Sequence, residues 1–139
     1  MLLGGRGETY RKIFDSMENN IFIRLFFNRT MFDETKIKKR VDIEEFINFI
    51  KGYKSEQIEC TNHTFFRLSE KQRKIYTDDE LRKILIREKP FLIGIQHNQN
   101  YAVFYKYKNK NLKMILNFAD RKIKIVTFYF IEEWQIPKI

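Results

Sequence analysis

The residues with the clearest chemical potential lie in Asn62–Tyr76, which reads NHTFFRLSEKQRKIY. Its apolar and charged residues recur at a helical period, so we expect one amphipathic helix. On that helix His63 and Arg67 lie one turn apart, opposite an apolar stripe. An imidazole that titrates near neutral pH and a guanidinium with a rigid fork of donors together suit a phosphate. The same charged side carries Glu70 and Lys74, with Lys71 and Arg73 on its flanks.

A solvated basic face is the alternative interpretation of this helix, because charge on the outer side of a surface helix is the usual condition. The pattern alone therefore leaves two possibilities open. The segment is either a phosphate-binding helix or an ordinary amphipathic helix.

Two hydroxyl side chains share one side of the last expected strand, 122–131. Because side chains alternate along a strand, Thr127 and Tyr129 point the same way, and Lys122 and Lys124 point to the other side. The hydroxyls can help to position a phosphate or a base. They are also common strand residues, so a structural role is the competing interpretation.

Lysines and tyrosines alternate in the segment 101–108, where Tyr105 and Lys106 are adjacent. Aromatic rings that stack on bases, next to cations that neutralise phosphates, are typical of single-stranded nucleic-acid binding. A strand with one wet face gives the same pattern.

The sequence supports a metal site or a catalytic thiol less well than it supports phosphate binding. Cys60 and His63 have a spacing seen in zinc sites, and His97 can join them, but a fourth ligand is missing. Cys60 and His63 also suggest a nucleophile pair, although a buried, inert thiol is the simpler interpretation. We expect neither a metal nor a cofactor.

Charge and composition narrow the class of partner. The 139 residues carry a formal charge of +9, and residues 61–139 hold 16 Lys/Arg against 8 Asp/Glu. A concentrated positive field favours nucleic acid or an acidic protein as partner. The single cysteine, Cys60, excludes an internal disulfide and points to a reducing compartment.

The longest apolar run, Ile21–Phe27, is interrupted by Arg24 and is too short to span a bilayer. We find no signal-peptide pattern at the start of the chain. We therefore expect a cytoplasmic protein that does not bind membranes. The aromatic run Ile21–Phe27 is also a candidate surface for a homodimer.

Periodicity assigns the elements. Asp42 and Thr77 are expected to cap helices, and the period changes from helical to alternating after Pro90. Short turn-rich connectors predict hairpins between the strands. We expect a mainly helical N-terminal extension over residues 1–55 and an α+β domain over residues 56–139, with helices packed on a four-stranded antiparallel β-meander. The other expected elements are a helix at 8–18, an ambiguous strand or helix at 21–28, a polar connection at 33–40, and strands at 91–96, 101–107, 112–118 and 122–131.

The order of these features resembles the RelE/BrnT-like toxin superfamily. The matching residues are His63 and Arg67 on a first helix, the helix start at 78–81 and the strand VTFYF at 126–130. The resemblance covers about residues 56–139 and implies a RelE-like fold, with RNA as substrate and an antitoxin protein as a partner.

The resemblance also implies roles for the site residues. The activity would be metal-independent cleavage of RNA, in which the 2′-hydroxyl attacks the adjacent phosphate. His63 would be the general acid or base, Arg67 with Lys71 or Lys74 would stabilise the phosphate, and Thr127 and Tyr129 would position it. Residues expected to bind RNA are Arg73, Tyr105, Lys106, Lys122 and Lys124. Two alternatives stay open: a non-catalytic nucleic-acid-binding protein, and a structural or dimerising protein.

Overall fold

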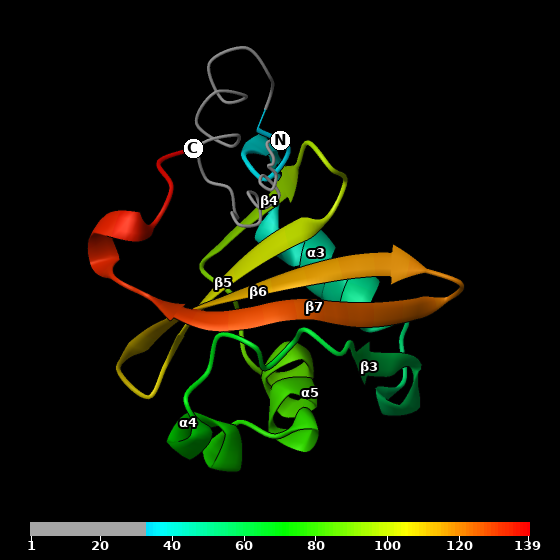
Figure 1. The fold of residues 1–139 in the computed structure, drawn as a ribbon. Helices are drawn as coiled ribbons and strands as arrows, with labels where there is room; N and C mark the ends of the chain where they lie inside the picture. The colour runs from blue at the N-terminus through cyan, green and yellow to red at the C-terminus, as the bar shows by residue number, and fades with distance from the viewer. Residues whose placement is uncertain (1–32) are drawn as a thin grey trace, which may run out of the picture. The chain divides into compact units, whose positions relative to one another are not determined.

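A six-stranded mixed sheet dominates residues 33–139, the part of the chain that the computed structural model describes (Figure 1). The strand order is β2-β4-β5-β6-β7-β3. β3 pairs parallel with β7, and the other neighbours in the sheet are antiparallel. The strands are β2 Ile37–Arg40, β3 Ile58–Cys60, β4 Leu92–Gln96, β5 Tyr101–Tyr107, β6 Lys110–Ala119 and β7 Lys122–Ile131.

Two tight hairpins set the register of the long strands. Lys108 and Asn109 join β5 to β6, Asp120 and Arg121 join β6 to β7, and all four residues have positive φ. Two-residue loops of this conformation match the right-handed twist of paired strands. A third turn, closed by the Gln96 N–H donating to the Asn100 carbonyl at 2.8 Å, joins the antiparallel strands β4 and β5. The three predicted hairpins and the four strands that they connect are therefore confirmed.

Each α-helix within residues 33–139 begins after a residue whose side chain accepts a hydrogen bond from the backbone N–H three residues later. These caps are Asp42, Ser69 and Thr77, and they satisfy donors that have no partner in the first helical turn. The predicted caps Asp42 and Thr77 are thus confirmed. The helices are α3 Ile43–Ile50, α4 Glu70–Ile75 and α5 Asp78–Arg87, with 3-10 turns η1 Ser55–Gln57 and η2 Glu133–Gln135.

One face of the sheet carries the main core. Phe46 and Ile50 of α3 and Leu81, Ile84 and Leu85 of α5 are buried against strand side chains of this face. Those strand residues include Ile93, Val103, Tyr105, Leu112, Met114, Leu116, Ile123, Ile125 and Phe128. The opposite face has a smaller buried cluster, formed by Leu92, Ala102, Phe104, Ile115 and Ile131, and Tyr129 packs against it.

The expected fold class, helices on a four-stranded antiparallel meander in a RelE-like domain, is wrong. Two short strands extend the meander into a six-stranded mixed sheet, with β2 beside β4 and β3 beside β7. Only α3, α4 and α5 are α-helical within residues 33–139, so the described unit is mostly β. The cause is pairing: segments too short to show a period of their own are held as strands by their neighbours.

The boundary of the compact unit also differs from the expected organisation. Residues Thr35–Ile139 cluster together, whereas we expected the extension to run to residue 55. The segment 33–40, expected to be a polar connection, contributes β2. α3 belongs to the main core through Phe46 and Ile50.

Several expectations fall on residues 1–32 and lie outside the described residues: the helix at 8–18, the element at 21–28 and the dimer surface Ile21–Phe27. In the described remainder of the chain, no helix combines the length and the apolar composition that crossing a membrane requires.

Candidate functional site

The segment 61–68 is a series of turns along the edge of β7, and two threonines hold it there. The Thr61 backbone N–H donates to the Ile125 carbonyl at 3.1 Å and to Thr64 Oγ1 at 2.8 Å. Thr64 is fully buried, and its hydroxyl donates to the same Ile125 carbonyl. The Thr61 hydroxyl donates to the Val126 carbonyl at 3.2 Å. The segment is therefore hydrogen-bonded to the edge of the sheet. These bonds compete with the backbone bonds of a helix.

The expected single helix over Asn62–Tyr76 is consequently wrong. Residues 62–67 form turns, and helix starts only at Glu70. Ser69 explains the new start, because its hydroxyl accepts from the Gln72 N–H while the Gln72 side chain accepts from the Ser69 N–H. This capping box stabilises the first turn of a helix that begins in the middle of the expected one.

His63 and Arg67 are both exposed, but they contact different groups. The His63 ring meets the Phe66 ring edge-on, with 6.0 Å between centroids. The Arg67 guanidinium lies over the Tyr129 ring, 3.8 Å from its centroid. Arg67 and Tyr129, which were both assigned to one phosphate, therefore lie close together, in contact with each other. The predicted helix, on which His63 and Arg67 would share one face and contact one phosphate, does not form.

Tyr129 is the centre of a cationic and aromatic cluster on the sheet. Lys113 is its partner across β6 and β7, and Lys113 Nζ lies 5.6 Å from the Tyr129 ring and 5.6 Å from the Phe104 ring. Phe104 is buried, so Tyr129, Lys113 and Arg67 supply the accessible part of the cluster. Thr127 lies on the same strand, two residues from Tyr129, and is half-buried.

The remaining predicted cations lie on several elements. Lys71, Arg73 and Lys74 are exposed on α4, and Arg73 Nε donates to the Phe65 carbonyl at 3.0 Å. Lys106 lies 3.5 Å from a Glu133 carboxylate oxygen, so part of its charge is neutralised there.

Lys122 pairs with Glu59 at 2.8 Å, which raises the pKa of Lys122 and lowers that of Glu59. Lys124 lies beside them on β7 and forms no ion pair with another described residue. Lys124 also contributes to the lowered pKa of Glu59, whereas Arg67 and Lys113 form no ion pair with another described residue.

Tyr105 was expected to bind RNA, but the structure places it in the main core with no exposed surface. Its hydroxyl has no hydrogen-bond partner among the described residues, and burial raises its pKa. Tyr105 therefore lies on the helix-covered face, away from the Tyr129 cluster.

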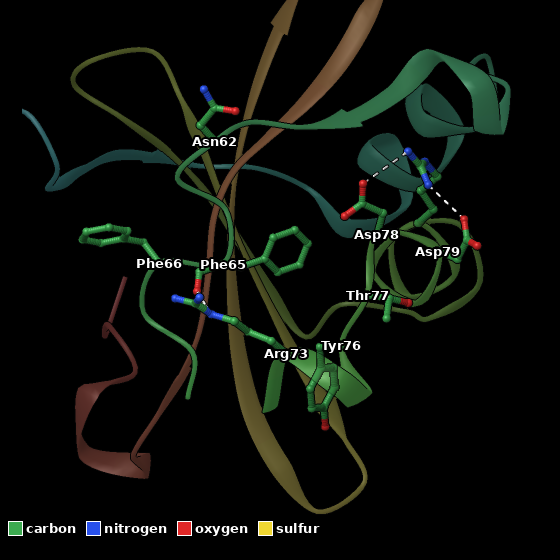
Figure 2. A pocket seen from close by; sticks show the side chains of 9 residues that line it. Asn62, Phe65, Phe66, Arg73, Tyr76, Thr77, Asp78 and Asp79 are labelled. Atoms are coloured by element: carbon green, nitrogen blue, oxygen red, sulfur yellow. Dashed lines mark hydrogen bonds and ion pairs between the residues drawn. The ribbon is translucent and has the colours of Figure 1, made fainter. Parts of the chain in front are cut away.

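A pocket of about 700 Å³ opens between the 62–67 turns, α4 and the start of α5 (Figure 2). Arg82 crosses its wall: Nε donates to the Ile58 carbonyl at 2.8 Å and Nη1 to Asp79 at 3.0 Å. Nη2 of Arg82 lies 4.0 Å from an Asp78 oxygen. The pocket is lined by Asn62, Phe65, Phe66, Arg73, Tyr76, Thr77, Asp78, Asp79 and Arg82.

Of these lining residues, only Arg73 was predicted to bind a ligand, so the sequence reasoning missed the pocket. One signal was present. Phe65 and Phe66 are adjacent, and two neighbouring rings cannot both face one core. Phe65 packs on the main core, and Phe66 is 75% exposed.

Cys60 lies near this pocket but is not a reactive thiol. Burial raises its pKa to about 12, and the neighbouring Asp78 carboxylate adds to the shift. A thiol with this pKa is protonated at neutral pH, which argues against a nucleophile pair with His63. Within residues 33–139, no three His, Cys, Asp or Glu side chains are grouped to hold a metal ion.

A comparison with protein-family models finds a match for part of the chain. No curated protein and no solved structure matches the chain. Residues 44–116 match the family model described as the MJ0788 family, which gives no indication of a relationship to RelE/BrnT-like toxins. The matched residues run from α3 into β6 and make up more than half of the 139 residues, and the chain therefore belongs to the MJ0788 family.

Proposed function

We propose that this protein binds single-stranded nucleic acid, with RNA as the expected ligand, through the surface around Tyr129. The observation that carries the proposal is the Arg67 guanidinium 3.8 Å over the Tyr129 ring, with Lys113 Nζ 5.6 Å from the same ring. A guanidinium plane supported by an aromatic ring offers a flat cationic platform on which an unpaired base can stack. The neighbouring lysines neutralise phosphates.

Charge supports the same conclusion. Residues 61–139 have twice as many Lys/Arg as Asp/Glu, 16 against 8. Arg67, Lys113, Lys71 and Lys74 form no ion pair with another described residue. Their counterions are released when a polyanion binds, which favours association at low salt.

The test is fluorescence anisotropy of a labelled oligouridine RNA with the full-length protein over a range of salt concentrations. We expect wild-type affinity to fall steeply as salt rises. Arg67→Ala should weaken binding about tenfold, because it removes both the charge and the stacking plane. Arg67→Lys, which keeps the charge but not the plane, should recover only part of that loss.

Arg87→Ala is the matched control, because Arg87 is an exposed arginine on the last turn of α5 and neither contacts the Tyr129 ring nor lines the pocket beside Phe66. It removes the same charge from a different surface and should change the affinity by no more than about twofold. The proposal is wrong if the wild type does not bind at low salt, or if the two alanine variants lose affinity equally.

RNA cleavage is the second candidate function. The observation that favours it is the exposure of His63 in the same run of turns that carries Arg67, since an accessible imidazole can reach a bound substrate as a general acid or base. Wild type and His63→Ala should be incubated with labelled RNA in chelator. Cleavage by the wild type alone would support catalysis and the toxin hypothesis. Intact RNA with both would leave binding as the function.

A further inference from the structure

We propose that the pocket beside Phe66 binds one guanine base of the nucleic acid held at Arg67 and Tyr129. The inference rests on the proposed function and names a specificity that the basic surface by itself does not provide. Four features of the pocket carry it: its neutrality, its aromatic walls, the arrangement of its donors and acceptors, and its position next to Arg67.

The pocket differs in charge from the surface around it. Its lining has two arginines, Arg73 and Arg82, and two aspartates, Asp78 and Asp79, so the formal charges cancel. Arg82 is also satisfied internally, by the Ile58 carbonyl and by Asp79. A neutral pocket on a basic protein does not select phosphate. It suits an uncharged group that carries both donors and acceptors, which describes a nucleobase.

The walls of the pocket are suited to a flat ring. Phe65 and Phe66 line one part, and Tyr76 lines another with its ring fixed against Phe128 and Phe130 at centroid distances of 5.5 and 5.2 Å. Phe66 is 75% exposed, so no part of the core requires it there. An exposed ring at a pocket mouth is available to stack on a base.

The polar groups select among the bases. Figure 2 shows the Arg73 guanidinium near the backbone of Phe65, and the Phe65 ring pointing toward the side of the pocket that carries Asp78 and Asp79. Arg73 Nε is held by the Phe65 carbonyl at 3.0 Å, which leaves its terminal N–H groups to donate. Guanine has the matching edges. Its O6 and N7 accept from an arginine, and its N1–H and amino group donate to a carboxylate. Adenine presents the acceptor N1 where guanine has a donor, so it would face the carboxylates unfavourably.

The pocket and the Tyr129 cluster are joined by the chain itself. Phe66 lines the pocket, and the next residue, Arg67, lies over Tyr129. The buried Thr64 hydroxyl, bonded to the Ile125 carbonyl of β7, fixes the turn that carries both. A nucleotide stacked at Arg67 therefore has its neighbour within reach of Phe66.

The experiment compares two labelled oligouridines, one with a single central guanosine and one with a single central adenosine, on the full-length protein. We expect the wild type to bind the guanosine oligomer about tenfold more tightly. Asp79→Asn should abolish this preference, because it replaces an acceptor by a donor, and Phe66→Ala should reduce affinity for the guanosine oligomer about tenfold.

Glu80→Gln is the matched control for Asp79→Asn. Glu80 also belongs to the acidic first turn of α5, but it bonds the Tyr107 hydroxyl at 2.6 Å and does not line the pocket. The Glu80→Gln variant should keep the guanosine preference. Arg67→Ala should lower the affinity for both oligomers and leave the ratio of the two affinities unchanged. Equal wild-type affinity for the two oligomers, or a preference that survives Asp79→Asn, would overturn the inference.

Failure of the proposed function gives a different result, in which neither oligomer binds. In that case free guanosine is titrated into isotope-labelled protein and the amide signals of Asp78 and Asp79 are followed by NMR. Shifts that saturate with guanosine and not with adenosine would support the pocket on its own. The absence of shifts would reject it together with the interface.

Discussion

At the scale of single residues, environment decides which reactive groups are available. Cys60 and His63 are close in sequence, yet the thiol is held protonated by burial and the imidazole is exposed in a turn against Phe66. Arg67 remains a candidate binding residue although its predicted secondary structure is wrong. Its expected helix does not form, but its guanidinium lies over the ring of Tyr129, which was assigned to the same phosphate. Residue type identified the candidates, and contacts determined their use.

The raised pKa of Cys60 predicts slow alkylation of its thiol in the folded protein. The pKa is raised from 9.0 to about 12, so below pH 9 the folded protein should hold roughly a thousandfold less thiolate than the unfolded chain. Alkylation by iodoacetamide at neutral pH should therefore be far slower for the native protein than for protein in urea, where the thiol titrates normally. The rate in native protein should keep rising with pH beyond 9. Similar rates in both states would show that the thiol is not shielded.

At the scale of elements, the sequence predicted helix caps and long alternating strands correctly. It did not predict which short segments pair with those strands. Asp42 and Thr77 are helix caps whose side-chain bonds span three residues, and the strands β4 to β7 alternate over several residues. Both kinds of pattern are complete within one segment. β2 and β3 are shorter, with four and three residues, and exist through Arg40 opposite Gly94 and Ile58 opposite Ile123. A partner distant in sequence leaves no mark on so short a segment.

The candidate site shows the same division. The stripe of His63, Arg67 and Lys74 fits a helical period, but the threonines Thr61 and Thr64 bond to β7 and Ser69 caps a new helix. The bonds of Thr61 and Thr64 could be recognised only after the position of β7 was known, whereas the Ser69–Gln72 capping box is local and was overlooked. The pocket was missed for this reason, since its walls come from segments that the turn brings together.

The Thr64 hydroxyl should be the bond that keeps this turn in place. Thr64→Val keeps the side-chain shape but leaves the Ile125 carbonyl and the Thr61 N–H each without one of their partners, which should cost about 1–3 kcal/mol of unfolding free energy. Urea unfolding followed by circular dichroism measures the loss. Thr127→Val on β7 is the control, because Thr127 makes no side-chain hydrogen bond to another described residue, and it should stay within about 0.5 kcal/mol. Equal losses in the two variants would contradict the assigned role of Thr64.

At the scale of the whole molecule, the helices and the sheet depend on one another. α3 lies before the position where we expected the domain to begin, yet Phe46 and Ile50 are 3% and 5% exposed within the main core. β2 covers the outer edge of β4, where Gly94 leaves room for Ile37: a Cβ on Gly94 would lie 2.5 Å from Ile37 Cγ2. The unit that carries the candidate site therefore requires both elements.

Shortened chains test this organisation. A chain of residues 35–139 keeps β2, α3 and the main core, so we expect one cooperative unfolding transition in urea. A chain of residues 56–139, cut at the boundary that the sequence suggested, loses Phe46 and Ile50 and exposes the edge of β4. Removal of a buried phenylalanine alone costs about 3–5 kcal/mol, which is a large part of the stability of a small domain. The shorter chain should therefore lack a cooperative transition and aggregate through its open strand edge. If both chains unfold with the same midpoint, α3 and β2 are accessory to the fold and the compact unit begins near residue 56.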